Sequence, residues 1–76
     1  MTSTKLSKLL TIYLYTNGHK ITKATKEVVE TVHENKTWTF STVRDGNGIY
    51  VEYLDSTLSF YRDDVLIKKT CLKSLV

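Results

Sequence analysis

The stretch Asp45-Gly46-Asn47-Gly48 has the residue types of a calcium-binding loop. Such a loop needs oxygen ligands at its first, third, fifth and twelfth positions and a glycine at its sixth. If Gly48 is that glycine, the first position is Val43 and the twelfth is Leu54, whose side chains cannot bind a metal ion. Gly and Asn tolerate positive φ angles, so we interpret the stretch as a tight turn between two strands and expect no metal there.

The other residues that could bind a metal ion or take part in catalysis stand apart in the sequence. His19, His33 and Cys71 lack the paired spacing of zinc ligands, and surface or core packing explains them better. The acid pair Asp63-Asp64 fits a turn, and the pair Glu30/Glu34 fits a helix surface. Acid–base catalysis would need carboxylates that converge in an apolar cleft. The sequence therefore predicts no enzyme, no metal and no cofactor.

Length and composition favour a small cytoplasmic protein. A chain of 76 residues without proline-rich or repetitive tracts predicts a single domain over residues 1–76 with no linker. The one cysteine cannot form an internal disulfide, so core packing must stabilise the fold. The apolar run Leu9–Tyr15 is too short to cross a membrane, and we expect no membrane partner.

Charge is segregated along the chain. Residues 1–26 carry five lysines and no acid, residues 27–64 carry all eight acids, and residues 65–76 carry three lysines. If the two basic ends meet in the fold, they create a basic face opposite an acidic one. Alternatively, neighbouring elements pair and neutralise each other.

The first half of the chain contains an ambiguous element. Branched and aromatic residues over Leu9–Tyr15 predict a strand, and Asn17-Gly18 predicts the turn that ends it. Over residues 22–35, apolar residues at spacings of three and four favour a helix, with opposite charges four residues apart. The many β-branched residues in the same stretch favour a strand instead.

The second half alternates between apolar and polar residues, which is typical of strands. Expected strands are Thr37–Val43, Ile49–Leu54, Leu58–Tyr61 and Val65–Lys69, with turns at Asp55-Ser56-Thr57 and Arg62-Asp63-Asp64. The predicted class is α+β, with one helix packed on one face of an antiparallel sheet of four to five strands in the order β-α-β-β-β-β.

Tyrosines and lysines are the candidate binding residues. One helix can cover only one face of a sheet, so several tyrosines must stay partly exposed, beside lysines. Such residues suit a protein interface, and they also suit stacking on nucleic-acid bases. The candidate partner-binding residues are Tyr13, Tyr15, Lys20, Lys23, Lys26, Tyr50, Tyr53 and Tyr61.

Residues 12–29, with Ile12, Tyr15, Asn17-Gly18, Lys20-Ile21 and Val28-Val29, resemble the N-terminal hairpin of a family of small phage anti-CRISPR proteins that block type I-F surveillance complexes. The resemblance covers under a quarter of the chain. It implies a non-enzymatic protein that docks on a Cas subunit and occludes the DNA-binding path, with Tyr15 in the contact.

Three functions are therefore expected, in descending order. The first is a phage- or mobile-element-encoded inhibitor that binds a host defence complex, which can be a nucleic-acid-guided one. The second is a small basic nucleic-acid-binding module that uses its lysines against phosphates and a tyrosine for stacking. The third is a homo-oligomeric structural protein, such as a homodimer, that pairs through an open sheet edge.

Overall fold

The computed structural model describes residues 3–44 and 48–72. These residues contain one helix and six strands, joined by turns and loops. The elements follow one another as α1 (Ser3–Thr16), β1 (Lys20–Ala24), β2 (Val28–His33), β3 (Lys36–Ser41), β4 (Ile49–Leu54), β5 (Thr57–Arg62) and β6 (Val65–Cys71). The strands form one six-stranded sheet in sequence order, and every neighbouring pair is antiparallel except β3–β4. The α+β class is confirmed, with more strands than expected and a different element order.

The prediction of a strand over residues 9–15 was wrong, because this stretch lies in α1. Four apolar residues favour the helix over a strand, because their spacing places them on one side of a helix. They are Leu6, Leu10, Tyr13 and Leu14, and all four are buried. The hairpin that the anti-CRISPR resemblance implies over residues 12–29 is not formed either, since its first part belongs to α1.

Asn17-Gly18 ends this helix rather than a strand. The amide of His19 donates to the carbonyl of Leu14 at 3.0 Å, and the amide of Gly18 donates to the carbonyl of Tyr15 at 3.3 Å. These two bonds define a Schellman motif, in which Gly18 takes the left-handed conformation with φ 89°. The dipeptide therefore acts as a helix cap, a role that its residue types fit as well as a hairpin turn.

The expected helix over residues 22–35 is also absent, and the stretch forms the β1–β2 hairpin. Val29 and Thr31 are fully buried on one face of β2, and Val32 lies half-buried on the other. The charges pair across the strands instead of along a helix, since Lys23 lies opposite Glu30. This pairing joins basic residues of the first third of the chain to acidic residues of the middle.

The later strands agree with the prediction within a few residues, and two-residue turns connect three of the hairpins. Positive φ angles occur at Glu34-Asn35, Asp55-Ser56 and Asp63-Asp64, with values between 51° and 64°. Two consecutive residues of this kind form a type I′ turn, whose twist matches that of antiparallel strands. The turns predicted near residues 55 and 63 are confirmed.

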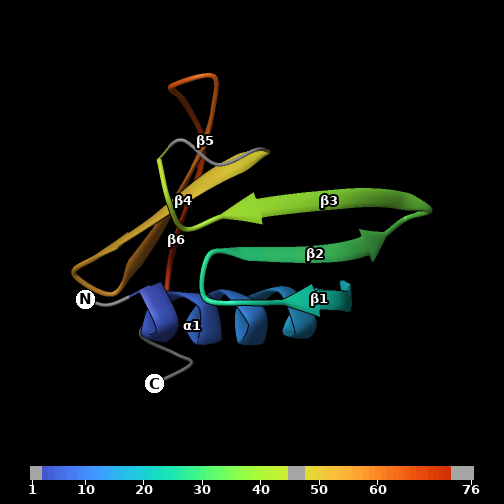
Figure 1. Cartoon of the computed structure of the whole chain (residues 1–76). Coiled ribbons are helices and arrows are strands. Elements are labelled where there is room, and N and C mark those ends of the chain that lie inside the picture. The colour runs from blue at the N-terminus through green and yellow to red at the C-terminus, as the bar shows by residue number, and fades with distance from the viewer. Residues whose placement is uncertain (1–2, 45–47, 73–76) are drawn as a thin grey trace.

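The connection between β3 and β4 differs from the expected hairpin. Phe40 pairs with Ile49 and Ser41 pairs with Tyr50 in a parallel ladder of only these two pairs. The strands then diverge, so that β1–β3 run alongside α1 while β4–β6 cross them steeply (Figure 1). Residues 45–47 lie outside the described residues, and the structure excludes only the expectation that their flanking strands form an antiparallel hairpin.

The core lies between α1 and one face of the sheet, which we call the covered face. The helix contributes the four apolar residues given above. The sheet contributes buried apolar side chains from four strands, namely Val29, Phe40, Ile49, Val51, Leu58 and Phe60, and Leu72 completes the cluster after β6. In the described part of the chain no element covers the opposite face, which we call the open face (Figure 1).

Candidate protein-binding surface

The open face carries a cluster of aromatic and charged side chains where β4 and β5 pair. Tyr50 and Tyr61 are directly opposite residues of the ladder, and their ring centroids lie 6.0 Å apart with the planes tilted by 36°. Arg44 precedes β4, and its Cζ lies 5.2 Å from the centroid of the Tyr50 ring. We call Arg44, Tyr50, Glu52 and Tyr61 the tyrosine–arginine cluster.

Hydrogen bonds and ion pairs hold this cluster in place. The Tyr50 hydroxyl donates to Oε2 of Glu52 at 3.2 Å, and Nη2 of Arg44 lies 3.5 Å from the same oxygen. Nη1 of Arg44 also lies 3.8 Å from Oδ1 of Asp64 in the β5–β6 turn. Three groups therefore surround the Arg44 guanidinium, whose side chain is 70% exposed.

Electrostatics keep the Tyr50 hydroxyl protonated. Burial raises the pKa of Tyr50, and the hydrogen bond to the Glu52 carboxylate raises it further. At neutral pH the phenol is therefore a hydrogen-bond donor and not a base.

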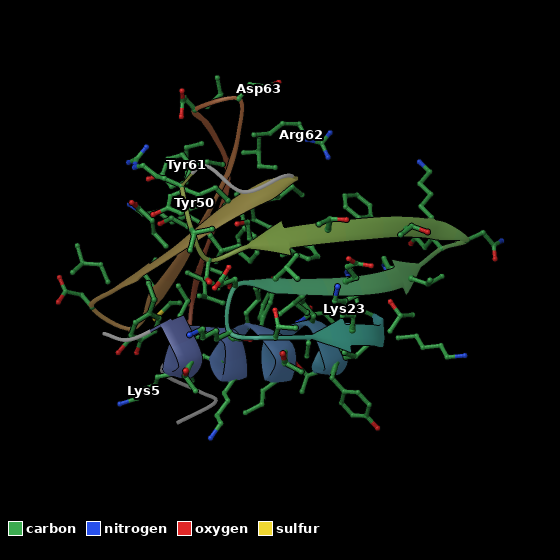
Figure 2. All side chains as sticks on the ribbon, in the orientation of Figure 1. Lys5, Lys23, Tyr50, Tyr61, Arg62 and Asp63 are labelled. Atoms are coloured by element: carbon green, nitrogen blue, oxygen red, sulfur yellow. The ribbon has the colours of Figure 1, made fainter. Side chains whose placement is uncertain are left out.

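The cluster borders a shallow hollow of about 160 Å³. Its lining combines a guanidinium, two phenols and two carboxylates, from Arg44, Gly48, Tyr50, Tyr61, Asp63 and Asp64. Figure 2 shows Tyr50 and Tyr61 near each other, with Arg62 and Asp63 on the same side of the molecule, away from α1. A side chain of a partner can enter such a hollow between the aromatic rings and the charged rim.

The structure brings together only two of the tyrosines proposed from the sequence. Tyr13 is 8% exposed and packs in the core, and Tyr53 lies half-buried against the core on the covered face. Tyr15 is 72% exposed on α1, far along the chain from the β4–β5 pair. Arg44 and Glu52 were not among the residues predicted from the sequence, because they lie eight residues apart and their contact depends on the fold.

The proposed lysines lie on a different part of the fold. Lys20 and Lys23 are exposed on β1, and Lys26 is exposed in the loop that follows. Lys26 lines a groove of about 280 Å³ between α1 and the end of β1, together with Lys8. Hydrogen bonds fix the groove, since Ser7 Oγ donates to the carbonyl of Thr25 at 2.6 Å.

The two histidines, which stand apart in the sequence, stack in the structure. Their ring centroids lie 4.2 Å apart, and Nδ1 of His19 shares a hydrogen bond of 2.7 Å with Oγ1 of Thr31. Burial lowers the pKa of His19, and the neighbouring His33 and Lys68 lower it further, while Glu34 opposes them. Both histidines line an apolar cavity of about 250 Å³ over the covered face.

Over residues 3–44 and 48–72, no group of three or more His, Cys, Asp or Glu side chains is placed to hold a metal ion. Cys71 is exposed at the end of β6. In the same residues, no helix has the length and apolar character needed to cross a membrane.

Comparison with known proteins finds no matching family model, no matching curated protein and no matching solved structure. The function must therefore be inferred from the residues of this chain and their arrangement.

Proposed function

We propose that this protein is a non-enzymatic binding protein that recognises a protein partner through the tyrosine–arginine cluster on the open face of its sheet. The supporting observation is the Tyr50–Tyr61 ring pair with the Arg44 guanidinium held beside it. Tyrosine and arginine are the residue types enriched among the strongest contributors to protein interfaces. A rigid sheet supports both rings, so binding immobilises few flexible side chains.

We further propose that the partner belongs to a host defence complex and that binding inhibits it. This part of the proposal rests on the resemblance of residues 12–29 to the anti-CRISPR family, in which Tyr15 would lie in the contact. Tyr15 remains 72% exposed on α1 and available to a partner. Tyr15 and the cluster therefore represent two separate candidate contacts, which substitutions can distinguish.

The test is capture of partners from a bacterial lysate on the immobilised protein, followed by mass spectrometry. We compare the wild type with the double variant Tyr50→Ser/Tyr61→Ser, which removes the rings of the cluster, and with Tyr15→Ser, which removes the other candidate contact. The proposed role of the cluster expects one dominant complex on the wild type and its loss on the double variant, whereas loss on Tyr15→Ser alone assigns the contact to α1. Equal capture by all three chains contradicts the role of the cluster, and no specific capture contradicts protein binding.

The inhibitory part requires a separate assay with a purified type I-F surveillance complex. We expect the protein to reduce target-DNA binding by the complex in a gel-shift titration. Unchanged DNA binding at saturating protein would limit the proposal to protein binding without this target. Circular dichroism of each variant checks that loss of binding does not reflect unfolding.

A second candidate function is nucleic-acid binding, which the groove between α1 and β1 favours. Lys8 and Lys26 line the same groove, and none of the residues that line it is acidic. Phosphate contacts by these lysines would make binding fall steeply with salt. A gel shift with Lys8→Glu/Lys26→Glu tests this alternative, which fails if the wild type has no affinity at low salt.

A further inference from the structure

The covered face of the sheet contains a cavity of about 250 Å³ near the C-terminal end of α1. Phe40 and Ile49, which pair in the short parallel ladder between β3 and β4, form part of its wall. Other apolar side chains of the wall come from α1, β3 and β5, namely Tyr13, Leu14, Trp38 and Phe60. None of the residues that line the cavity belongs to the tyrosine–arginine cluster, so the two sites are separate.

Aromatic rings surround Phe40 within this wall. The Trp38 ring stacks on it with centroids 6.5 Å apart and planes 16° apart, and the Phe60 ring meets it edge-on at 6.0 Å and 76°. The Trp38 indole N–H donates to the carbonyl of His33 at 3.4 Å, which holds the indole in this orientation. Aromatic rings attract one another in stacked and edge-to-face arrangements, so the wall favours an aromatic ligand over an aliphatic one of the same size.

The volume and the opening of the cavity suit a small molecule. An apolar protein cavity of about 150 Å³ holds one benzene molecule, which has six non-hydrogen atoms. By the same ratio, a cavity of about 250 Å³ holds about ten non-hydrogen atoms, which corresponds to one ring with a short substituent. Asn17, Ile67 and Lys68 also line the cavity and are exposed, so a ligand can enter from solvent.

Lys68 gives the open side of the cavity a positive charge. It lies directly opposite Phe60 in the β5–β6 ladder, and its Nζ lies 5.5 Å from the centroid of the Tyr13 ring. Among the described residues, no acidic side chain lines the cavity and none forms an ion pair with Lys68. A cation without a counter-charge beside an apolar wall favours a ligand that carries a negative group.

His19 supplies a hydrogen-bond donor near this charge. Oγ1 of Thr31 lies 2.7 Å from Nδ1 of His19, and the fully buried Thr31 hydroxyl makes no other hydrogen bond with a described residue. The hydroxyl therefore donates to Nδ1, and the proton of the neutral ring lies on Nε2. Lys68 is one of the charges that lower the pKa of His19, so the two groups lie near each other. An N–H donor and an ammonium group together match the two oxygens of a carboxylate.

We propose that this cavity binds a small aromatic carboxylate, whose negative group lies at Lys68 and His19. The ring of the ligand packs against Phe40 and Trp38. This inference goes beyond the proposed partner binding and does not depend on it, because the cavity and the tyrosine–arginine cluster lie on opposite faces of the sheet. A ligand of about ten non-hydrogen atoms that fills such a site binds with a dissociation constant of about 1 mM or lower.

Phenylacetate has the size and the chemistry that the cavity requires, and it is the probe for this site. Trp38 is the only tryptophan of the chain, so its fluorescence should change saturably as phenylacetate is added. In proton–nitrogen NMR spectra we expect shifts at the Trp38 indole N–H and at the amides of His19 and Phe40. The amides of Arg44 and Glu52 should stay in place. No binding at about ten times the expected dissociation constant overturns the proposal, and so do shifts centred on Arg44 and Glu52.

Phenylacetamide, an uncharged molecule of nearly the same shape, tests the role of the charge. The wild type should bind phenylacetate about threefold to fivefold more tightly at low salt, which is the range for an exposed ion pair. Lys68→Met keeps the apolar part of the side chain and should remove this preference, while phenylacetamide binding stays the same. Lys69→Met is the matched control and should keep the preference, because Lys69 lies opposite Ser59 and does not line the cavity. Circular dichroism checks that both variants fold. Equal affinity of the wild type for the two molecules overturns the assignment of a carboxylate, and so does an equal preference in the two variants.

Discussion

Substitution of Leu10 by alanine tests the packing of α1 on the sheet. Leu10 is completely buried in the core, whereas Ile12, two residues later, is 51% exposed on the other side of the helix. If residues 9–15 formed a strand, these two residues would lie on the same face and would be equally buried. The two substitutions Leu10→Ala and Ile12→Ala therefore distinguish the helix from the strand.

The two substitutions should differ several-fold in how much they lower the free energy of unfolding. Removal of a fully buried leucine side chain costs about 2–5 kcal/mol, because the transfer energy of the lost atoms is added to the cost of the cavity. A domain of 76 residues has a total stability of about 4–11 kcal/mol. Leu10→Ala should therefore lower the melting temperature by at least about 10 °C. Ile12→Ala loses less buried surface and gains helix propensity, so we expect a change below about 0.5 kcal/mol.

Urea unfolding followed by circular dichroism measures both free energies of unfolding, provided that the slope with denaturant stays the same. The helix is supported if Leu10→Ala loses at least about 2 kcal/mol and Ile12→Ala changes little. Equal losses for the two variants would refute the helical packing of residues 9–15. If Leu10→Ala does not fold, the variant Leu10→Val takes its place in the measurement, because it removes less volume from the core.

Other substitutions test single features of the fold. Gly18→Ala should cost about 1–2 kcal/mol in urea unfolding because φ is 89°, and Gly18→Asn should cost less. Gly48→Ala should cost more than Gly18→Ala, since φ is 84° and a Cβ there would lie 2.9 Å from the Cβ of Thr39. The lowered pKa of His19 means that the unfolded chain binds the proton first, so stability should fall as pH decreases below about 6.5. His19→Gln should reduce that pH dependence in thermal melts, and an unchanged slope would contradict it.

Local features of the sequence were sufficient to predict much of the secondary structure in the second half of the chain. Alternating residues predicted the strands now seen as β4, β5 and β6, and turn residues predicted the Asp55-Ser56 and Asp63-Asp64 turns. These features depend on side-chain parity and on residues that tolerate positive φ, both of which are local properties.

The first half shows where local signals conflict. The stretch Leu9–Tyr15 has strand-forming residue types but helical spacing from Leu6 onward, and residues 20–33 have helical spacing but β-branched residues. Short apolar runs fit both patterns, so burial against the rest of the core decides between them. Asn17-Gly18 did not resolve the conflict, because the same dipeptide caps a helix or turns a hairpin.

The sequence by itself determined the turns at Asp55-Ser56 and Asp63-Asp64, the strand alternation after Ile49, and the absence of spaced ligands in the Asp45–Gly48 stretch. Only the tertiary structure decided the helix at the N-terminus, the parallel β3–β4 pair, and the contacts that join Arg44, Tyr50 and Glu52. The physical reason is the range of the interactions: turns and alternation act between neighbouring residues. Core packing, strand pairing and side-chain clusters depend on residues that meet only when the chain has folded.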